Sequence, residues 1–366
     1  MKAASIQPES LLASTEHRLV IRATLKPVAG LNRFQPAGFP EIGHVLYDAP
    51  VEGGRTTKVC IVDSSPSMAN HLETVCLQGA HDPSPVPELA GLPYVRCVTG
   101  EPGNPEVVVT TFTEGHRLAS TYFLRGKRMV GGKPVAKTFE EELPGEFGLR
   151  DLGKKSHPMP KDWWNVFRTI FQYDPGSLVH GILFPQWQIK IPRALTAVHE
   201  ATGAKSVRSS GVKFDKIGLT NSGQPIFAKD EETAEEIVAT FVLDLSLIRS
   251  FGRDKLGLDA KQKALLVALS LWKVGALLKS PFRYRSGCDL ECEKIEAKLG
   301  SQSLGVSKAS DLAVDIASYI QAAGFKAGVT DVFWEQKELF KDANKEPAKS
   351  KGPEGDDSDA AAEGED

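Results

Sequence analysis

Few residues in this sequence have the types and spacing that acid–base chemistry requires. Two places stand out: Asp63 ends an apolar run, and Glu114 lies two positions before His116. A carboxylate at a strand end could act as a catalytic acid, and a carboxylate–histidine pair could transfer protons. The alternatives are an Asp63 that caps backbone N–H groups of the following turn and an ordinary surface pair at Glu114 and His116. These are the commoner uses of such residues.

Motifs for other chemistries are missing from the sequence. It contains no phosphate-binding P-loop, no GxGxxG after a strand and no Gly-x-Ser-x-Gly elbow. His199-Glu200 begins like a zinc-protease helix, but position 203 is glycine, so the second histidine is absent. The eight histidines have no metal-ligand spacing to the five cysteines, which form no CxxC pair. We therefore expect no metal, no cofactor and free thiols in a reducing cytoplasm.

The most informative stretch, 62–73, reads VDSSPSMANHLE and follows the apolar run 59–62. It predicts a buried strand that leads into a helix at 66–78, capped by Ser65, with Pro66 where a missing N–H costs nothing. The apolar face of this helix would consist of Met68, Leu72, Val75 and Cys76. The other face would present Ser67, Asn70, His71 and Thr74. Short, neutral polar side chains of this kind suit hydrogen bonding to a phosphate backbone.

Basic residues beside small or aromatic ones recur along the chain. The clusters are Arg33-Phe34, His116-Arg117, Lys190 with Arg193, Arg208 with Lys213, and Arg283-Tyr284-Arg285. Arginine makes bidentate phosphate contacts and stacks on bases. The net charge is −3, but the last 15 residues carry seven acids and no base, so the remaining 351 residues carry +4. A mildly basic body permits an anionic partner, although each cluster alone could be a solvated face.

The elements that would position these residues are a mixture of strands and helices. Alternating or β-branched runs predict strands at 17–25, 57–63, 106–113 and 236–247. Periodic or capped runs predict helices at 66–78, 162–172, 193–201, 259–279 and 307–323. Strands and helices do not alternate regularly, which indicates an α+β fold with insertions. No apolar run is long enough to span a membrane.

A series of blocks in sequence order resembles the backbone subunit of type I-G (formerly I-U) CRISPR surveillance complexes, a family of the RAMP superfamily. The blocks are RFQPAGFP (33–40), VDSSPSMANHLE (62–73), EGHRLAS (114–120), YDPGSLVHG (173–181), IPRALTA (191–197), SSGVK (209–213), FVLDL (241–245) and FRYRSGCDL (282–290). The resemblance spans residues 18–290, which is most of the chain before its acidic end.

The resemblance implies an RRM-like (ferredoxin-like) palm with large insertions, among them a protruding thumb for which 27–56 and 125–137 are the candidates. The body would be 1–343, followed by an acidic tail at 344–366 whose composition predicts disorder. It also implies a non-catalytic, cytoplasmic subunit. Copies would polymerise along one CRISPR RNA and present its spacer to target DNA, with other Cascade subunits and a separate helicase–nuclease as partners and no membrane.

The residues expected to contact this RNA combine the basic clusters with the polar helix face. They are Arg33, Ser67, Asn70, His71, His116, Arg117, Arg193, Lys213, Arg283 and Arg285. Position 71 is usually arginine in the family, and histidine is not a fixed cation at pH 7. For His180 and Arg193, simple packing in the fold is the alternative, because both adjoin apolar segments. No RNP-type aromatic pair is found, so we expect the RNA to follow loops and helix starts.

Two other functions remain open from the sequence. One is a RAMP-type endoribonuclease that cuts guide-paired RNA, with Asp63 or the pair of Glu114 and His116 as catalyst. The other is a structural assembly protein that binds no nucleic acid.

Overall fold

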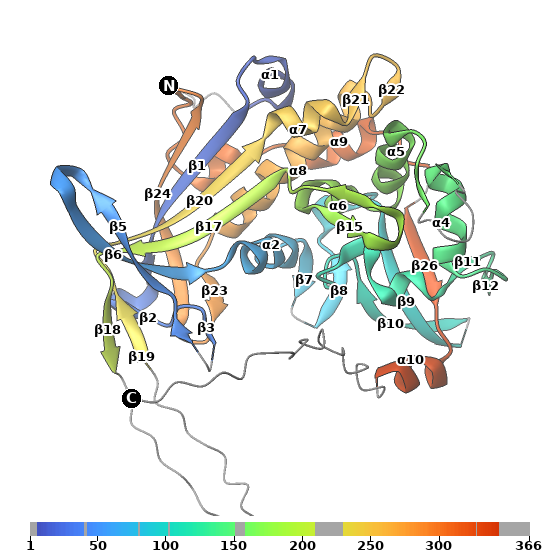
Figure 1. Cartoon of the computed structure of the whole chain (residues 1–366), viewed down its shortest axis with the longest axis horizontal. Helices are drawn as coiled ribbons and strands as arrows, with labels where there is room; N and C mark the ends of the chain where they lie inside the picture. The colour runs from blue at the N-terminus through green and yellow to red at the C-terminus, as the bar shows by residue number, and fades with distance from the viewer. Residues whose placement is uncertain are drawn as a thin grey trace, which may run out of the picture.

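The computed structural model describes residues 6–39, 42–79, 81–101, 103–150, 158–208, 230–326 and 328–343 (Figure 1). The predicted contact residue Lys213 and the acidic tail lie outside these ranges. None of the described helices has the length and apolar character that a membrane crossing requires. The five cysteines carry free thiols, and four of them are buried.

The larger sheet is antiparallel and curled. Its strands run in the spatial order β23 (Phe282–Arg285), β24 (Cys288–Leu299), β1 (Arg18–Pro27), β20 (Glu236–Asp244), β17 (Leu195–Thr202), β6 (Arg55–Asp63) and β5 (Leu46–Val51), with β25 (Gln302–Ser303) paired to β24. In β1, Leu19, Ile21 and Ala23 are at most 2% exposed and alternate with half-buried or exposed residues. One face of the sheet is therefore the core.

The described helices that contact this sheet also contact one another through α8 (Figure 1). Those in contact with the sheet are α2 (Ser65–Thr74), α6 (Pro175–His180), α7 (Leu245–Ser250) and α8 (Ala260–Leu278). Helix α8 begins with an Asp259–Gln262 capping box and is buried on nearly all sides. Its outer side packs against α1 (Pro8–Ala13), α9 (Ile316–Ala322) and a 3-10 turn at Ala309–Leu312.

The opposite face of the sheet is open and has no aromatic side chain on its central strands. Its outward residues include Arg22 on β1, Thr240 on β20 and Val198 on β17, which lie side by side in register. Val198 is 40% exposed. The central strands of this face therefore offer no aromatic side chain for stacking bases.

A second sheet lies beside the first. Its order is β10 (Asn104–Thr110), β9 (Tyr94–Glu101), β26 (Val329–Phe333), β11 (Lys127–Val130) and β12 (Lys133–Pro134), and β26 pairs in parallel with β9. Near it lie α3 (Thr121–Leu124), α4 (Phe139–Phe147) and α5 (Trp163–Tyr173), and the hairpin of β15 (Ile182–Phe184) and β16 (Ile189–Ile191) lies between the sheets (Figure 1).

The remaining elements are short. One is a three-stranded sheet of β18 (Lys205–Arg208), β19 (Asp230–Thr233) and β2 (Arg33–Phe34). Four are two-stranded pairs: β3 (Gly38–Phe39) with β4 (Gly43–His44), β7 (Leu77–Gly79) with β8 (Asp82–Pro85), β13 (Leu149–Arg150) with β14 (Met159–Pro160), and β21 (Gly252–Arg253) with β22 (Leu256–Gly257). The last is helix α10 (Gln336–Ala343).

The structure confirms the mixed fold and most predicted elements, but the helix predicted at 193–201 is wrong. This segment is β17, in which Leu195, Ala197 and His199 alternate toward the core. Pairing with β6 and β20 overrides the helix propensity of its alanines and leucine.

Several boundaries also differ from the predictions. The strand predicted at 236–247 ends at Asp244, and Leu245 begins helix α7. The helix predicted at 66–78 ends at Thr74, and its cap is Ser64 rather than Ser65. The helix predicted at 307–323 is divided into the 3-10 turn and α9. The aperiodic segment 27–56 contains β5, which pairs with β6 in the large sheet.

Candidate nucleic-acid interface

Asp63, the last residue of β6, organises the amino end of α2. Its Oδ1 accepts a hydrogen bond from the Ser64 N–H at 2.9 Å and lies 2.9 Å from Arg285 Nη2, and its Oδ2 lies 2.8 Å from His71 Nε2. Burial acts to raise the pKa of Asp63, but His71 and Arg285 together bring it below the usual value. The carboxylate is thus an ionised anchor for the helix start.

Ser67, His71 and Asp63 have the residue types of a hydrolytic triad but not its geometry. Ser67 Oγ lies 3.4 Å from His71 Nε2, the same nitrogen that contacts Asp63. A proton relay needs the nucleophile on one ring nitrogen and the carboxylate on the other. The three side chains therefore form a fixed polar cluster rather than an activated serine.

The polar face of α2 brings together several predicted contact residues. The His71 ring packs edge-on against Phe282 and Tyr284 of β23, at centroid distances of 5.4 and 5.3 Å. Asn70 is exposed. Arg283 is exposed and pairs with Asp289 at 2.8 Å. Ser67, His71 and Arg285 are half-buried, so Asn70 and Arg283 are the members most accessible to a ligand.

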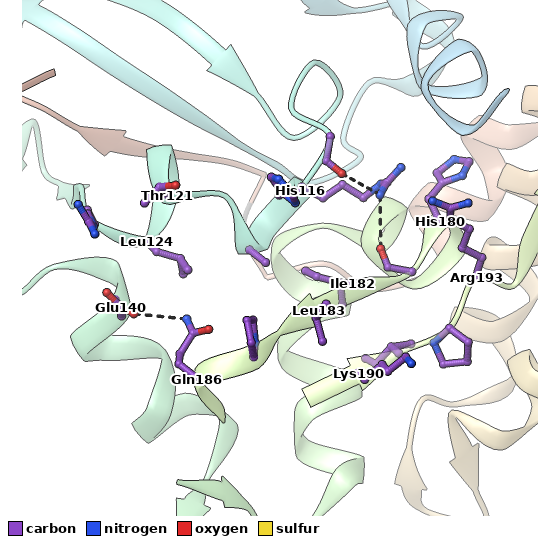
Figure 2. Close-up of a pocket in the computed structure, with 18 residues that line it drawn as sticks. His116, Thr121, Leu124, Glu140, His180, Ile182, Leu183, Gln186, Lys190 and Arg193 are labelled. Atoms are coloured by element: carbon purple, nitrogen blue, oxygen red, sulfur yellow. Dashed lines mark hydrogen bonds between the residues drawn. The ribbon is translucent and has the colours of Figure 1, made fainter. Parts of the chain in front are cut away.

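A pocket of about 760 Å³ opens between the 3-10 turn at Arg117–Ala119, α3 and the β15–β16 hairpin (Figure 2). We call it the Arg193 pocket. Among the described residues, its ionisable lining consists of one carboxylate, Glu140, and the basic side chains of His116, Arg117, Arg125, His180, Lys190 and Arg193. Figure 2 shows Gln186 hydrogen-bonded to Glu140 at one end and Arg193 beside His180 at the other.

Arg117 is neutralised within the fold. Its Nε and Nη2 donate to the two carboxylate oxygens of Glu73, at 2.6 and 2.7 Å, and both side chains are at most 6% exposed. Its Nη1 donates to the carbonyls of Gly115 and Gly181. Burial raises the pKa of Glu73 to about 7 against the opposing charges of Arg117 and Lys273. This pair therefore joins α2 to the 3-10 turn at Arg117–Ala119 that lines the pocket.

Arg193 and Lys190 are not neutralised. In the part of the chain that the structure describes, neither side chain has a hydrogen-bond or ion-pair partner. Burial and the neighbouring Arg117 guanidinium lower the pKa of Arg193. Gly181 permits this placement, because its φ is +79° and an added Cβ would lie 3.0 Å from Arg193 Cγ. The pocket thus has an excess of positive charge.

His180, 1% exposed, supplies an unused donor beside Arg193. Its Nε2 lies 2.8 Å from Lys273 Nζ. An ammonium group only donates, so Nε2 must accept and the ring proton must be on Nδ1. Burial and the cations Lys273 and Arg117 hold the pKa of His180 well below its ordinary value. Among the described residues, Nδ1 has no partner.

The structure separates the predicted contact residues into three places. Ser67, Asn70, His71, Arg283 and Arg285 lie on α2 and β23, and His116, Arg117 and Arg193 line the pocket. Arg33 lies on β2 and pairs with Glu231 at 2.8 Å. Glu73 and Lys273 are not among the predicted site residues, although a charge within the apolar face of a helix is a usable signal for a buried partner.

His199 gives a prediction about acid stability. It is fully buried on β17, neither ring nitrogen has a partner in the described chain, and burial lowers its pKa to about 3. Below pH 6.5 the unfolded chain binds a proton at His199 that the folded chain does not bind. The free energy of unfolding therefore decreases as the pH is lowered. We expect His199→Leu to reduce this fall by about 1.4 kcal/mol per pH unit between about pH 6 and 4.

Urea unfolding of both proteins across this pH range measures the effect. His81→Leu is the matched control, because His81 is exposed. Parallel stability–pH curves for the wild type and His199→Leu would contradict the assignment.

The family model described as CRISPR-associated protein GSU0053 matches residues 19–206, a little more than half of the chain. No curated protein matches.

Two solved structures are similar at low identity. A structure described as "CRISPR RNA-guided surveillance complex, pre-nicking" shares 12% identity over 76% of this chain and 75% of that chain, with a TM-score of 0.36. The crystal structure of Csc2 of Thermofilum pendens shares 11% sequence identity over 93% of this chain and 79% of that chain, with a TM-score of 0.30. Likeness at this level is too distant to support an argument about function.

Proposed function

The chain belongs to the family of CRISPR-associated protein GSU0053, and on this premise we propose that it is a non-catalytic subunit that binds CRISPR RNA in a type I-G surveillance complex. Several copies would line one guide RNA and present its spacer for pairing with target DNA. The other Cascade subunits and a separate helicase–nuclease would be its partners.

The observation that carries this proposal is the excess positive charge of the Arg193 pocket. Lys190 and Arg193 have no carboxylate partner in the described chain, whereas Arg117 beside them is paired with Glu73. Uncompensated cations on a concave surface favour an anionic ligand. A phosphate backbone is the anion that a CRISPR-associated protein meets, and phosphate contacts supply most of the affinity for nucleic acids.

Chain topology supports an RRM-like palm. The elements β1, α2, β17, β20, α8 and β24 follow one another along the chain, and the four strands lie in the order β24, β1, β20, β17. This is the order of a split β-α-β-β-α-β unit with both helices on one face. Because the open face has no aromatics on its central strands, RNA would follow the loops and helix starts around the pocket and α2.

Two contacts support a non-catalytic role. Asp63 is ion-paired with Arg285 and buried, and Glu114 accepts from the backbone N–H of His116 at 3.3 Å rather than from its ring. Neither carboxylate is positioned as a general base. We expect complementary labelled RNA to stay intact when incubated with the assembled complex and a divalent metal. Regularly spaced cuts that Asp63→Ala abolishes would establish the ribonuclease alternative instead.

Co-purification tests the RNA-binding role. The chain is expressed together with a CRISPR array and purified, and the ratio of absorbance at 260 and 280 nm is measured. We expect retained RNA whose sequence contains the spacers. Protein that purifies free of RNA would favour the structural assembly alternative.

A further inference from the structure

We infer that the Arg193 pocket holds one nucleoside phosphate, with the phosphoryl group at the Arg193 end and the base against the wall formed by Leu183 and Pro185. This inference makes the ligand of the proposed function more specific, and it rests on that function only for the source of the nucleotide. That source is either an RNA strand or a free mononucleotide.

The phosphoryl end of the pocket is defined by donors without acceptors. Arg193 and Lys190 have no hydrogen-bond or ion-pair partner in the described chain, because the nearby Glu73 is paired with Arg117. His180 adds a buried N–H at Nδ1 that has no acceptor among the described residues. An unsatisfied buried donor is rare and costly in a folded protein, so an acceptor in this position is expected. A phosphoryl group supplies several acceptor oxygens and negative charge together.

The other wall of the pocket is apolar and accessible. Leu183, at the middle of β15, is 54% exposed although it is a large hydrophobic residue. Pro185, the first residue of the turn between β15 and β16, is also exposed and lines the pocket. Proteins that hold single bases sandwich them between apolar or aromatic side chains. An exposed leucine beside uncompensated cations fits a ligand with a flat apolar part and an anionic part.

The size of the pocket fits this ligand. Its volume of about 760 Å³ lies in the range of roughly 300–1,000 Å³ that holds small ligands. Inorganic phosphate alone would leave the Leu183 wall bare, and a nucleoside alone would leave the charge of Arg193 unmet. The combination of both parts in one ligand is therefore what the pocket selects.

Calorimetry on the full chain, purified free of nucleic acid, tests this with three probes: 5′-AMP, adenosine and inorganic phosphate. We expect AMP to bind at least about tenfold more tightly than either of the others, since only AMP makes both sets of contacts. Arg193→Gln should weaken AMP binding at least about tenfold, and Leu183→Ser about threefold or more.

Matched controls come from the β21–β22 hairpin, which does not line the pocket. Arg253 and Leu256 are exposed there, so Arg253→Gln and Leu256→Ser make the same chemical changes elsewhere. Both should bind AMP like the wild type. AMP binding no tighter than phosphate binding, or equal loss in Arg193→Gln and Arg253→Gln, would overturn the inference.

Competition with a ten-nucleotide single-stranded RNA identifies the source. If the strand supplies the nucleotide, the RNA displaces AMP and Arg193→Gln weakens both ligands. AMP binding that RNA does not displace supports a free nucleotide and counts against the pocket as an RNA site. If RNA binding depends on Arg193 but AMP does not bind, the proposed function stands and the inference that the pocket holds a nucleoside phosphate is wrong.

Discussion

Glu73→Ala is expected to lower the free energy of unfolding by about 3–5 kcal/mol. The substitution leaves the Arg117 guanidinium, whose side chain is 6% exposed, without its bidentate partner. A buried charge that loses its partner retains the full cost of desolvation, because neither water nor another carboxylate replaces the pair. Urea unfolding at pH 8, where the wild-type Glu73 is largely ionised, measures the loss.

The matched control for this variant is Glu142→Ala. Glu142 pairs with Arg128 at 3.0 Å, but the Arg128 side chain is 30% exposed, so the loss should be about 1 kcal/mol or less. The double variant Glu73→Leu with Arg117→Met should cost less than the sum of the two single variants, since it leaves no unpaired charge. A Glu73→Ala variant as stable as Glu142→Ala would contradict the role of the pair.

The double charge reversal of Lys190→Glu with Arg193→Glu is expected to weaken binding of single-stranded RNA at least about 100-fold. Hydrogen bonds to charged groups contribute about 1.5–3 kcal/mol each, so the loss of two such contacts reaches this range. The slope of log K against log salt should also become shallower by about 1.4, because two fewer phosphates are neutralised. Fluorescence anisotropy at several salt concentrations measures both quantities.

Arg253→Glu with Lys255→Glu is the control for overall charge. Both residues are exposed on the β21–β22 hairpin, and the variant changes the net charge by the same amount. We expect its RNA affinity to fall less than about threefold, since distant surface charges are screened. An equal loss in the two double variants would show that the effect comes from net charge and not from the pocket.

Local signals in the sequence were sufficient for much of the fold. The Asp259 cap and the apolar run behind it predict α8, and the alternation of Leu19, Ile21 and Ala23 predicts β1. The strand at 195–202 could not be predicted in this way, because its alanines and leucine favour a helix until β6 and β20 provide pairing partners.

The candidate site was predictable as residue types but not as an arrangement. His116, Arg117 and Arg193 are conspicuous in the sequence, and the structure places all three around one pocket. The sequence cannot show that Arg117 pairs with Glu73, 44 residues away, while Arg193 stays unpaired. That difference depends on how α2 packs beside the β15–β16 hairpin, and it determines which cation is available to a ligand.

A density map of the complex assembled with its guide RNA would show whether the Arg193 pocket binds this RNA. We expect a phosphate oxygen of the RNA within hydrogen-bonding distance of the Arg193 guanidinium, with Lys190 facing the same strand. An RNA path that leaves the Arg193 pocket filled by solvent or by another protein chain would contradict it.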